Sequence, residues 1–307
     1  MLNRDQVEEF RATGVLVVED VLPDSVLAAV KSEYQNLANG LLEGNAMTPS
    51  GDFEADLLAL HRAGIDWFQT MDISLPGDRI KADTPFHIGP AVFDMLTAPE
   101  LLDVVQCLIG PEISSTPIQH VRIKPPVADL ADGEVRAHVG GTDWHQDRGV
   151  ALEEADDTQM ITVWIAITDA TPENGCLTAV PRVSEMLPHC PMRQTTIAPG
   201  ALDTSTAMPL PVGAGGVVIL DPYIPHAALD NRSHGIRWSF DLRYHVTGQP
   251  SGRAHFPEFV ARSVAAPETA LSDWRAWKDM WTDTRARLAD APHIEQHRWQ
   301  ADAPACA

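Results

Sequence analysis

The amino-acid sequence predicts a mainly β fold with helices packed against it from both ends of the chain. Short apolar or alternating segments recur through its middle, at 120–124, 160–168, 176–180, 217–220 and 236–246. Helical patterns, with apolar residues three and four positions apart, come before these segments and after them. Strands at such short spacing, between terminal helices, are typical of a double-stranded β-helix. We therefore expect a jelly-roll, cupin-like core with an N- and C-terminal helical buttress.

The length and composition of the chain fit one globular domain. Its 307 residues are 44% hydrophobic and 21% charged, which is ample for a buried core. We expect a single domain over residues 1–307. Within it, residues 1–115 would form helical and strand support, residues 116–250 the jelly-roll core, and residues 251–307 a C-terminal helical extension.

Charge and hydropathy limit the partners of the chain. The formal net charge is −21, which argues against nucleic acid or an anionic membrane as main partner, because both reward clustered cations. No run of 18 apolar residues predicts a transmembrane helix, and the charged N-terminus lacks the apolar core of a signal peptide. We expect a cytoplasmic protein that acts on a small molecule, and the sequence leaves its oligomeric state open. Consistent with that compartment, we interpret four cysteines without paired spacing as reduced thiols: Cys107, Cys176, Cys190 and Cys306.

Caps and apolar spacing predict the elements before the core. Asn3 opens a capping box for a short helix that Gly14 ends, and residues 15–18 form a strand. A second helix begins near Asp24 and carries apolar residues along one side.

The flanks nearer the core are less uniform. Residues 97–100 resemble a capping box whose helix ends at Gly110, whereas residues 40–95, rich in Gly, Pro and Asp, give no clear elements. We expect part of 40–95 to cover the functional site. After the core, one amphipathic helix is predicted to pack against the barrel through Trp274, Trp277, Trp281 and Leu288.

The clearest strand of the core is 160–168. Alternation places Thr162 and Trp164 on one face. The opposite face carries Ile161, Val163, Ile165 and Ile167. Asn174-Gly175 then predicts a turn before the next strand.

A histidine and an aspartate two residues apart, in the stretch Trp144-His145-Gln146-Asp147, provide the first candidate metal ligands. On an extended strand both side chains point to the same face. A second histidine, His226, lies 81 residues downstream. Two histidines and one carboxylate form the facial set that holds Fe(II) in non-haem oxygenases and leaves three positions open for small ligands.

The strand 236–246 has a consistently polar face. Arg237, Ser239, Asp241 and Arg243 alternate with aromatic and apolar residues. Arg237 follows His226 by 11 residues, enough chain to return along a neighbouring strand to the same cavity. Its guanidinium could bind a carboxylate in a bidentate fork, and a surface salt bridge is the alternative reading. Arg243, farther along the strand, is expected to matter much less than Arg237 for binding of that carboxylate.

Taken together, these motifs resemble the phytanoyl-CoA dioxygenase family of iron- and 2-oxoglutarate-dependent oxygenases. The resemblance covers roughly residues 4–250 and rests on Trp144-His145-Gln146-Asp147, Trp164, Asn174-Gly175-Cys176, His226, Asn231 and Arg237. It implies a jelly-roll core with Fe(II) on His145, Asp147 and His226. It also implies that 2-oxoglutarate binds iron and Arg237, with Ser239, Trp164 and His120 beside the co-substrate.

The resemblance also implies a reaction. Such enzymes use O₂ and 2-oxoglutarate, release succinate and CO₂, and oxidise a C–H bond of the substrate. An aspartate at position 147 favours hydroxylation, because a small apolar residue there would open a halide site, as in related halogenases. We expect a small organic substrate, such as an amino acid or a natural-product intermediate. Only four lysines in an acidic chain make an acyl-CoA less suitable.

Several alternatives stay open at this point. The same scaffold could catalyse epoxidation, desaturation or rearrangement, or could bind a metal without catalysis. His234 and His245 could also serve as ligands, although a polar surface or cavity role is favoured for both. His189 is expected in a loop, and the acidic stretch 127–139 is expected to shape the pocket mouth.

Overall fold

The computed structural model describes residues 1–77, 79–129, 142–191, 195–292, 294–295 and 298–306. The expected acidic stretch 127–139 lies largely outside these residues. The α-helices are α1 Arg4–Thr13, α2 Asp24–Gly44, α3 Phe53–Arg62, α4 Phe68–Met71, α5 Pro90–Leu96, α6 Pro99–Ile109, α7 Asp147–Val150 and α8 Trp274–Leu288. Short 3₁₀ turns are η1 Val127–Asp129, η2 Glu153–Ala155, η3 Pro267–Thr269 and η4 Pro304–Cys306.

Antiparallel pairs build the two sheets of a double-stranded β-helix, as predicted. The larger, seven-stranded sheet runs β1-β10-β5-β12-β2-β13, with β3 also paired to β12, and the smaller, four-stranded sheet runs β4-β11-β6-β9. A two-stranded ribbon joins β7 to β8. The strands are β1 Val15–Val18, β2 Ile113–Ser115, β3 His120–Lys124, β4 Thr142–His145, β5 Met160–Ala166, β6 Leu177–Ala179, β7 His189–Pro191, β8 Thr195–Ile197, β9 Met208–Leu210, β10 Val217–Leu220, β11 His226–Ala228, β12 Arg237–Val246 and β13 Phe259–Arg262.

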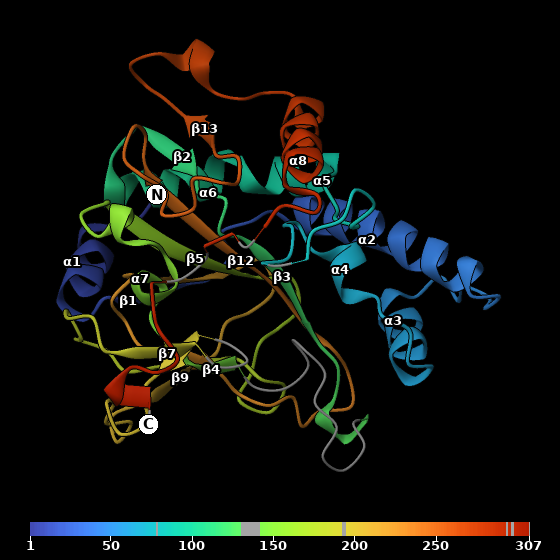
Figure 1. Cartoon of the computed structure of the whole chain (residues 1–307), viewed down its shortest axis with the longest axis horizontal. Helices are drawn as coiled ribbons and strands as arrows, with labels where there is room; N and C mark the ends of the chain where they lie inside the picture. Colours follow the sequence, from blue (N-terminus) through green and yellow to red (C-terminus); the bar gives the residue numbers. More distant parts are fainter. Residues whose placement is uncertain (78, 130–141, 192–194, 293, 296–297, 307) are drawn as a thin grey trace.

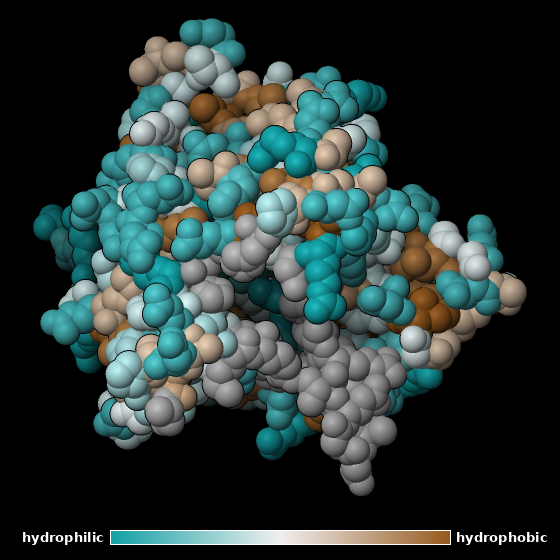
Figure 2. Space-filling model, in the orientation of Figure 1, coloured by the Kyte–Doolittle hydropathy of each residue, from teal (hydrophilic) through white to brown (hydrophobic). Residues whose placement is uncertain are grey.

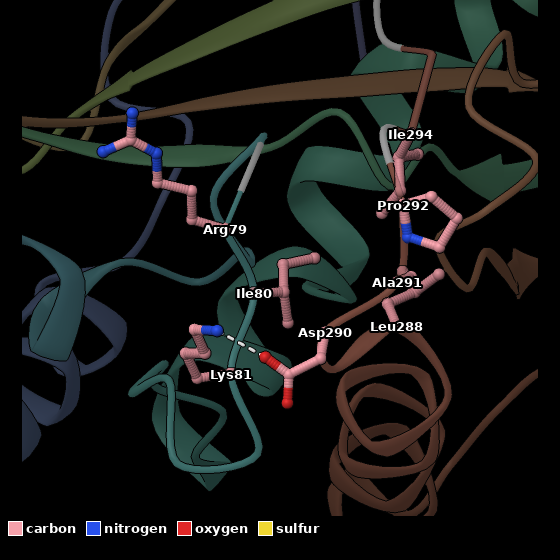
Figure 3. A pocket seen from close by; sticks show the side chains of 8 residues that line it. All are labelled: Arg79, Ile80, Lys81, Leu288, Asp290, Ala291, Pro292 and Ile294. Atoms are coloured by element: carbon pink, nitrogen blue, oxygen red, sulfur yellow. Dashed lines mark hydrogen bonds and ion pairs between the residues drawn. The ribbon is translucent and has the colours of Figure 1, made fainter.

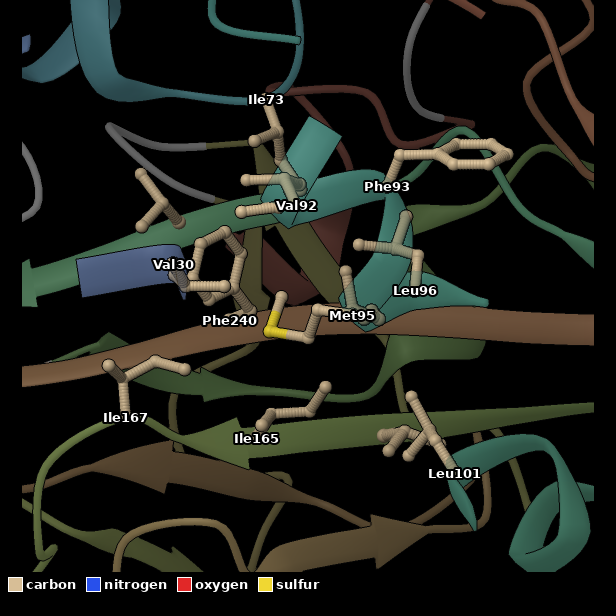
Figure 4. Close-up of a cluster of buried hydrophobic side chains, with 14 of the residues drawn as sticks. Val30, Ile73, Val92, Phe93, Met95, Leu96, Leu101, Ile165, Ile167 and Phe240 are labelled. Carbon is tan, nitrogen blue, oxygen red and sulfur yellow. The ribbon is translucent and has the colours of Figure 1, made fainter. Parts of the chain in front are cut away.

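The large sheet has one face for the core and one for the cavity. Helices α2 to α6 and α8 lie on its outer side, and the small sheet lies on the other (Figure 1). The outer face contributes Ile165, Ile167 and Phe240 to a hydrophobic core with Val30 and Met95 from the helices (Figure 4). Because side chains alternate along β5 and β12, their remaining residues face the small sheet.

The N-terminal elements agree in part with the sequence. Asn3 does form the capping box of α1, and Gly14 ends that helix with φ +73°. The capping box predicted at 97–100 is wrong, because α6 begins at Pro99 behind Ala98, which makes no side-chain cap. The hydroxyl of Thr97 instead donates to the carbonyl of Phe93 in the preceding helix. Residues 40–95 contain α3, α4 and α5.

The C-terminal helix packs as predicted. Trp277 and Trp281 of α8 are buried in the main core, and Trp274 is partly buried against it. The prediction of four reduced thiols is wrong, because Cys190 in β7 and Cys306 in η4 form a disulfide. Their positions are 116 residues apart, so spacing along the chain could not reveal that the C-terminus returns to β7. Cys107 and Cys176 are free thiols.

The face of the molecule in Figure 2 is mostly hydrophilic, as a formal net charge of −21 requires. Within the described residues, no helix is long and apolar enough to cross a membrane.

Candidate metal centre

The three predicted metal ligands meet at the edge of the small sheet. His145 ends β4 and His226 begins β11, and the two residues are paired partners in the antiparallel register. Asp147 does not lie on the strand as predicted: it begins α7, directly after β4. The turn nevertheless brings its carboxylate to both rings, at 3.8 Å from Nε2 of His145 and 3.9 Å from Nε2 of His226. One ligand atom from each residue lies within 4.8 Å of the others.

Both imidazoles are oriented for metal binding by the backbone. Nδ1 of His145 donates to the carbonyl of Asp143 at 2.8 Å, and Nδ1 of His226 donates to the carbonyl of Ile224 at 3.0 Å. These bonds fix the tautomer that leaves the Nε2 lone pair free for a ligand role. Burial, and then the neighbouring ring of His226, lowers the pKa of His145 to about 3. His145 is therefore neutral at physiological pH, as a metal ligand must be.

Two buried side chains hold the carboxylate of Asp147. Arg243 contacts Oδ1 and the hydroxyl of Thr162 donates to Oδ2. Burial would raise the pKa of Asp147, but Arg243, followed by the two histidines, outweighs it and lowers that pKa below its usual range. Sequence reasoning missed this role of Arg243, because the chain turns at Asp147 and carries its carboxylate onto β12. A carboxylate has about four acceptor positions, so one can still serve a metal.

A guanidinium faces the same cavity from β12. Arg237 is buried, and within the described residues its hydrogen-bond acceptors are neutral: the carbonyls of Gly175 at 3.1 Å and Arg122 at 3.3 Å, and Oγ of Ser239 at 2.5 Å. Its guanidinium lies 5.2 Å from the ring centre of Trp164. Burial, and then Arg122, lowers the pKa of Arg237 to about 9. The group is therefore still cationic at neutral pH and can accept an anionic partner.

The cavity brings most of the predicted site residues together. It is lined by Arg122, Thr142, His145, Thr162, Trp164, Leu177, His226, Ala227, Arg237 and Asp241. Thr162 and Trp164 face it as their alternation predicted. His120 is not among its lining residues, because its Nδ1 pairs with Asp72 at 2.9 Å.

Two basic residues of β3 were missed by sequence reasoning. Arg122 lines the cavity, and Lys124 is buried beside Arg237, with which it is paired in register. Nζ of Lys124 donates to the carbonyl of Leu229 at 3.0 Å. Burial, and then Arg237, lowers the pKa of Lys124 to about 6. The sequence could have indicated both residues, because Arg122 and Lys124 lie on the same face of the strand as His120.

His234, His245 and His189 lie outside the ligand set. His234 is exposed, and Nδ1 of His245 bonds the hydroxyl of Thr116 at 2.8 Å. The prediction of a loop at His189 is wrong. This residue begins β7, is 1% exposed, and its Nε2 accepts from the backbone N–H of Gln146 at 3.0 Å, between two candidate ligands.

A second cavity, of about 450 Å³, lies away from these ligands. Arg79, Ile80 and Lys81 form one wall and the chain after α8 forms the other (Figure 3). Lys81 and Asp290 pair across it, and both are largely exposed. Arg79 extends away from this cavity in Figure 3.

The donor set fits a divalent iron ion. Two imidazole nitrogens and one carboxylate oxygen are the ligand types of non-haem Fe(II) sites, and here these atoms lie within 4.8 Å of one another. The backbone bonds at both Nδ1 atoms supply the outer support that such ligands usually have. Fold and donor set together define a double-stranded β-helix protein with a two-histidine, one-carboxylate centre.

Comparison with known families gives the same class. The family model described as phytanoyl-CoA dioxygenase matches residues 10–239. The chain belongs to the phytanoyl-CoA dioxygenase family.

Similar solved structures share the fold at low identity. The apo form of ThoJ, a non-heme monooxygenase, has a TM-score of 0.60 and 18% identity, over 92% of this chain and 96% of that chain. EvdO2 from Micromonospora carbonacea var. aurantiaca, complexed with 2-oxoglutarate, has a TM-score of 0.54 and 20% identity, over 80% and 92%. The epimerase SnoN, in complex with Fe³⁺, alpha ketoglutarate and nogalamycin RO, has a TM-score of 0.52 and 17% identity, over 81% and 87%.

Proposed function

We propose that this protein is an Fe(II)- and 2-oxoglutarate-dependent dioxygenase that hydroxylates an unactivated C–H bond of a small organic substrate, with release of succinate and CO₂. The observation that carries the proposal is one cavity with two kinds of site. His145, Asp147 and His226 offer metal ligands, and Arg237 offers a buried cation whose described acceptors are neutral. A dicarboxylate that chelates the metal needs such a cation at its far end.

Each residue then has a stated task. His145, Asp147 and His226 would hold the iron, which when bound supplies the dioxygen chemistry. Arg237 and Ser239 would fix the far carboxylate of 2-oxoglutarate, and the ring of Trp164 would bound its carbon chain. The structures of EvdO2 and SnoN contain this co-substrate, which supports the assignment. An amino acid or a natural-product intermediate is the substrate class that we favour.

The test is anaerobic titration of Fe(II) and then 2-oxoglutarate, followed by the visible absorbance of the complex. His145→Ala, Asp147→Ala and His226→Ala should each abolish metal binding and turnover while the fold survives. His234→Ala, which removes an exposed histidine, is the matched control and should bind like the wild type. Full iron occupancy in the His226→Ala protein would overturn the ligand assignment.

The outcome of the reaction is tested separately. Turnover with a library of small metabolites should give one succinate per oxidised product, and mass spectrometry should find a gain of one oxygen atom. A product with two hydrogens fewer, or with an unchanged mass and altered connectivity, would replace hydroxylation by desaturation or rearrangement.

A further inference from the structure

The chain after α8 returns to the metal centre. Beyond Leu288 it forms a wall of the second cavity up to Ile294 (Figure 3). Its last described part, residues 298–306, then reaches the edge of β7 (Figure 1). We call residues 298–306 the C-terminal strap. No sequence motif of the centre extends this far, yet the strap lies against the turn that carries Asp147.

Two side chains of the strap hold the backbone of this turn. Nε1 of Trp299 donates to the carbonyl of Gly149 at 2.6 Å. The guanidinium of Arg298 donates to the carbonyl of Ala151 at 3.0 Å and to the carboxylate of Asp156 at 2.8 Å. The Arg298 side chain is 7% exposed. The carbonyl of Gly149 belongs to α7 and that of Ala151 follows its last residue, so these bonds support a four-residue helix that is too short to be stable by its own hydrogen bonds.

His189 supports the chain between β4 and this turn in a similar way. Its ring stacks on Trp299, with ring centres 5.2 Å apart. Nδ1 donates to the carbonyl of Leu187 at 2.8 Å, so Nε2 accepts from the N–H of Gln146 at 3.0 Å. The fit against Gly149 is close, because a Cβ built there would lie 2.5 Å from the ring of His189. The stacked rings of His189 and Trp299 therefore hold both Gln146, which lies between the two ligands, and the turn after Asp147.

The strap is also joined covalently to this stack. Cys306 near its end forms the disulfide with Cys190, the neighbour of His189. The bond limits how far Trp299 can move from the ring of His189, because only six residues separate Trp299 from Cys306.

We infer that Trp299 and His189 are positioning residues of the metal centre, and that the Cys190–Cys306 disulfide locks them in place. This rests on the proposed metal site. Each of the two residues holds the backbone on which His145 and Asp147 stand, through Gln146 N–H and Gly149 C=O. Metal sites need ligands held to within about 0.5 Å, and outer supports of ligands typically change metal affinity about ten- to a hundredfold.

The experiment compares Trp299→Ala with Trp274→Ala in the full chain. Both variants remove a half-buried tryptophan from the C-terminal region, but Trp274 lies on α8 away from the centre. Co(II) affinity is measured by anaerobic titration of its visible bands, and the melting temperature of each metal-free protein is measured beside it. Trp299→Ala should weaken Co(II) binding about ten- to a hundredfold. Trp274→Ala should lower the melting temperature and leave the affinity unchanged.

One further variant keeps the test decisive. If Trp299→Ala does not fold, Trp299→Phe decides, because it keeps the stacking and loses only the bond to Gly149. It should show an intermediate loss of affinity. Affinity equal to wild type in the folded Trp299 variants would overturn the positioning role. A wild-type protein that binds no Co(II) would overturn the metal site itself, and this inference with it.

The disulfide is tested by reduction. A dithiol transfers two electrons to the Cys190–Cys306 bond, which yields two protein thiols and the cyclic disulfide of the reagent. After the reagent has been removed under anaerobic conditions, the reduced wild type should bind Co(II) more weakly than the oxidised protein, with the affinity of Cys306→Ser. Cys306→Ser should not respond to the treatment, and Cys107→Ser should respond like wild type. Unchanged affinity after reduction would overturn the locking role of the disulfide.

Discussion

Replacement of Arg243 by methionine should destabilise the metal-free protein through Asp147. The guanidinium is 3% exposed, contacts Oδ1 of Asp147 and donates to the carbonyl of Ile118 at 2.9 Å. With methionine at this position, the hydroxyl of Thr162 is the one described hydrogen-bond donor that remains for the buried carboxylate. Removal of one partner from a buried ion pair costs about 3–5 kcal/mol. The melting temperature should therefore fall by roughly 5–8 °C, because the unfolding entropy of a 307-residue chain gives about 1.6 °C per kcal/mol.

A bound metal should offset much of this loss. The dication replaces the missing positive charge beside Asp147, so the difference between Arg243→Met and wild type should shrink when Co(II) is present. The assay is thermal unfolding, with and without Co(II), under anaerobic conditions. The pH dependence has a defined sign. Because Arg243 lowers the pKa of Asp147, its contribution is present above the ordinary carboxyl pKa of about 4 and is lost as the pH falls through the lower folded value.

A double-mutant cycle provides the control. In an Asp147→Asn background the side chain carries no charge, so Arg243→Met should cost less than it does in the wild type, and the difference measures the coupling. The same fall in melting temperature in all three settings, with metal, without metal and in the Asp147→Asn background, would refute the account. Arg243 would then act through packing rather than through the carboxylate.

Three other substitutions test separate parts of the structure. Arg237→Ala should weaken 2-oxoglutarate binding about ten- to a hundredfold, from a charge-assisted bond of roughly 1.5–3 kcal/mol, and Arg237→Lys should recover only part. Arg232→Ala, which removes an exposed arginine outside the cavity, is the control in the same titration. Burial and Arg237 hold the pKa of Lys124 at about 6, so binding of a dianion should take up a proton and weaken as the pH rises above that value. Calorimetry in two buffers should detect the uptake, and Lys124→Met should abolish it. Gly14→Ala should destabilise the fold by more than Gly248→Ala in chemical denaturation: both glycines have positive φ, but only at Gly14 would a Cβ meet an isoleucine side chain, at 2.5 Å.

Alternating patterns that continue over many residues were predictable from the sequence. The alternation along β5 and β12 holds over 7 and 10 residues, so both the core face and the cavity face follow from it. Thr162 and Trp164 were placed on the face opposite the isoleucine row for this reason. His145 and His226 were selected as one ligand set by residue type, and their pairing across two strands explains how the set is assembled.

Short elements and returning chain ends were not predictable in the same way. Asp147 leaves the strand at once and begins α7, which brings its carboxylate onto Arg243, a contact that the strand pattern did not predict. Lys124 was missed although it shares a strand face with His120, because its place beside Arg237 depends on the pairing of β3 with β12. His189 and Cys190 belong to a strand of three residues, which is too short for an alternating pattern to be recognised. Their partners, Trp299 and Cys306, lie more than a hundred residues away along the chain.

The register of His145 opposite His226 has a consequence for how the protein opens. β4 and β11 are strands of 4 and 3 residues, and few main-chain bonds hold such a pair together. A metal bound to both histidines is a cross-link between points 81 residues apart in the sequence. It removes conformational freedom from the open chain and favours the closed form by mass action. Under the proposed ligand assignment, loading with iron should therefore raise the free energy of local unfolding at the cavity edge, so the metal would stabilise the pairing of β4 with β11 in addition to its proposed part in the reaction.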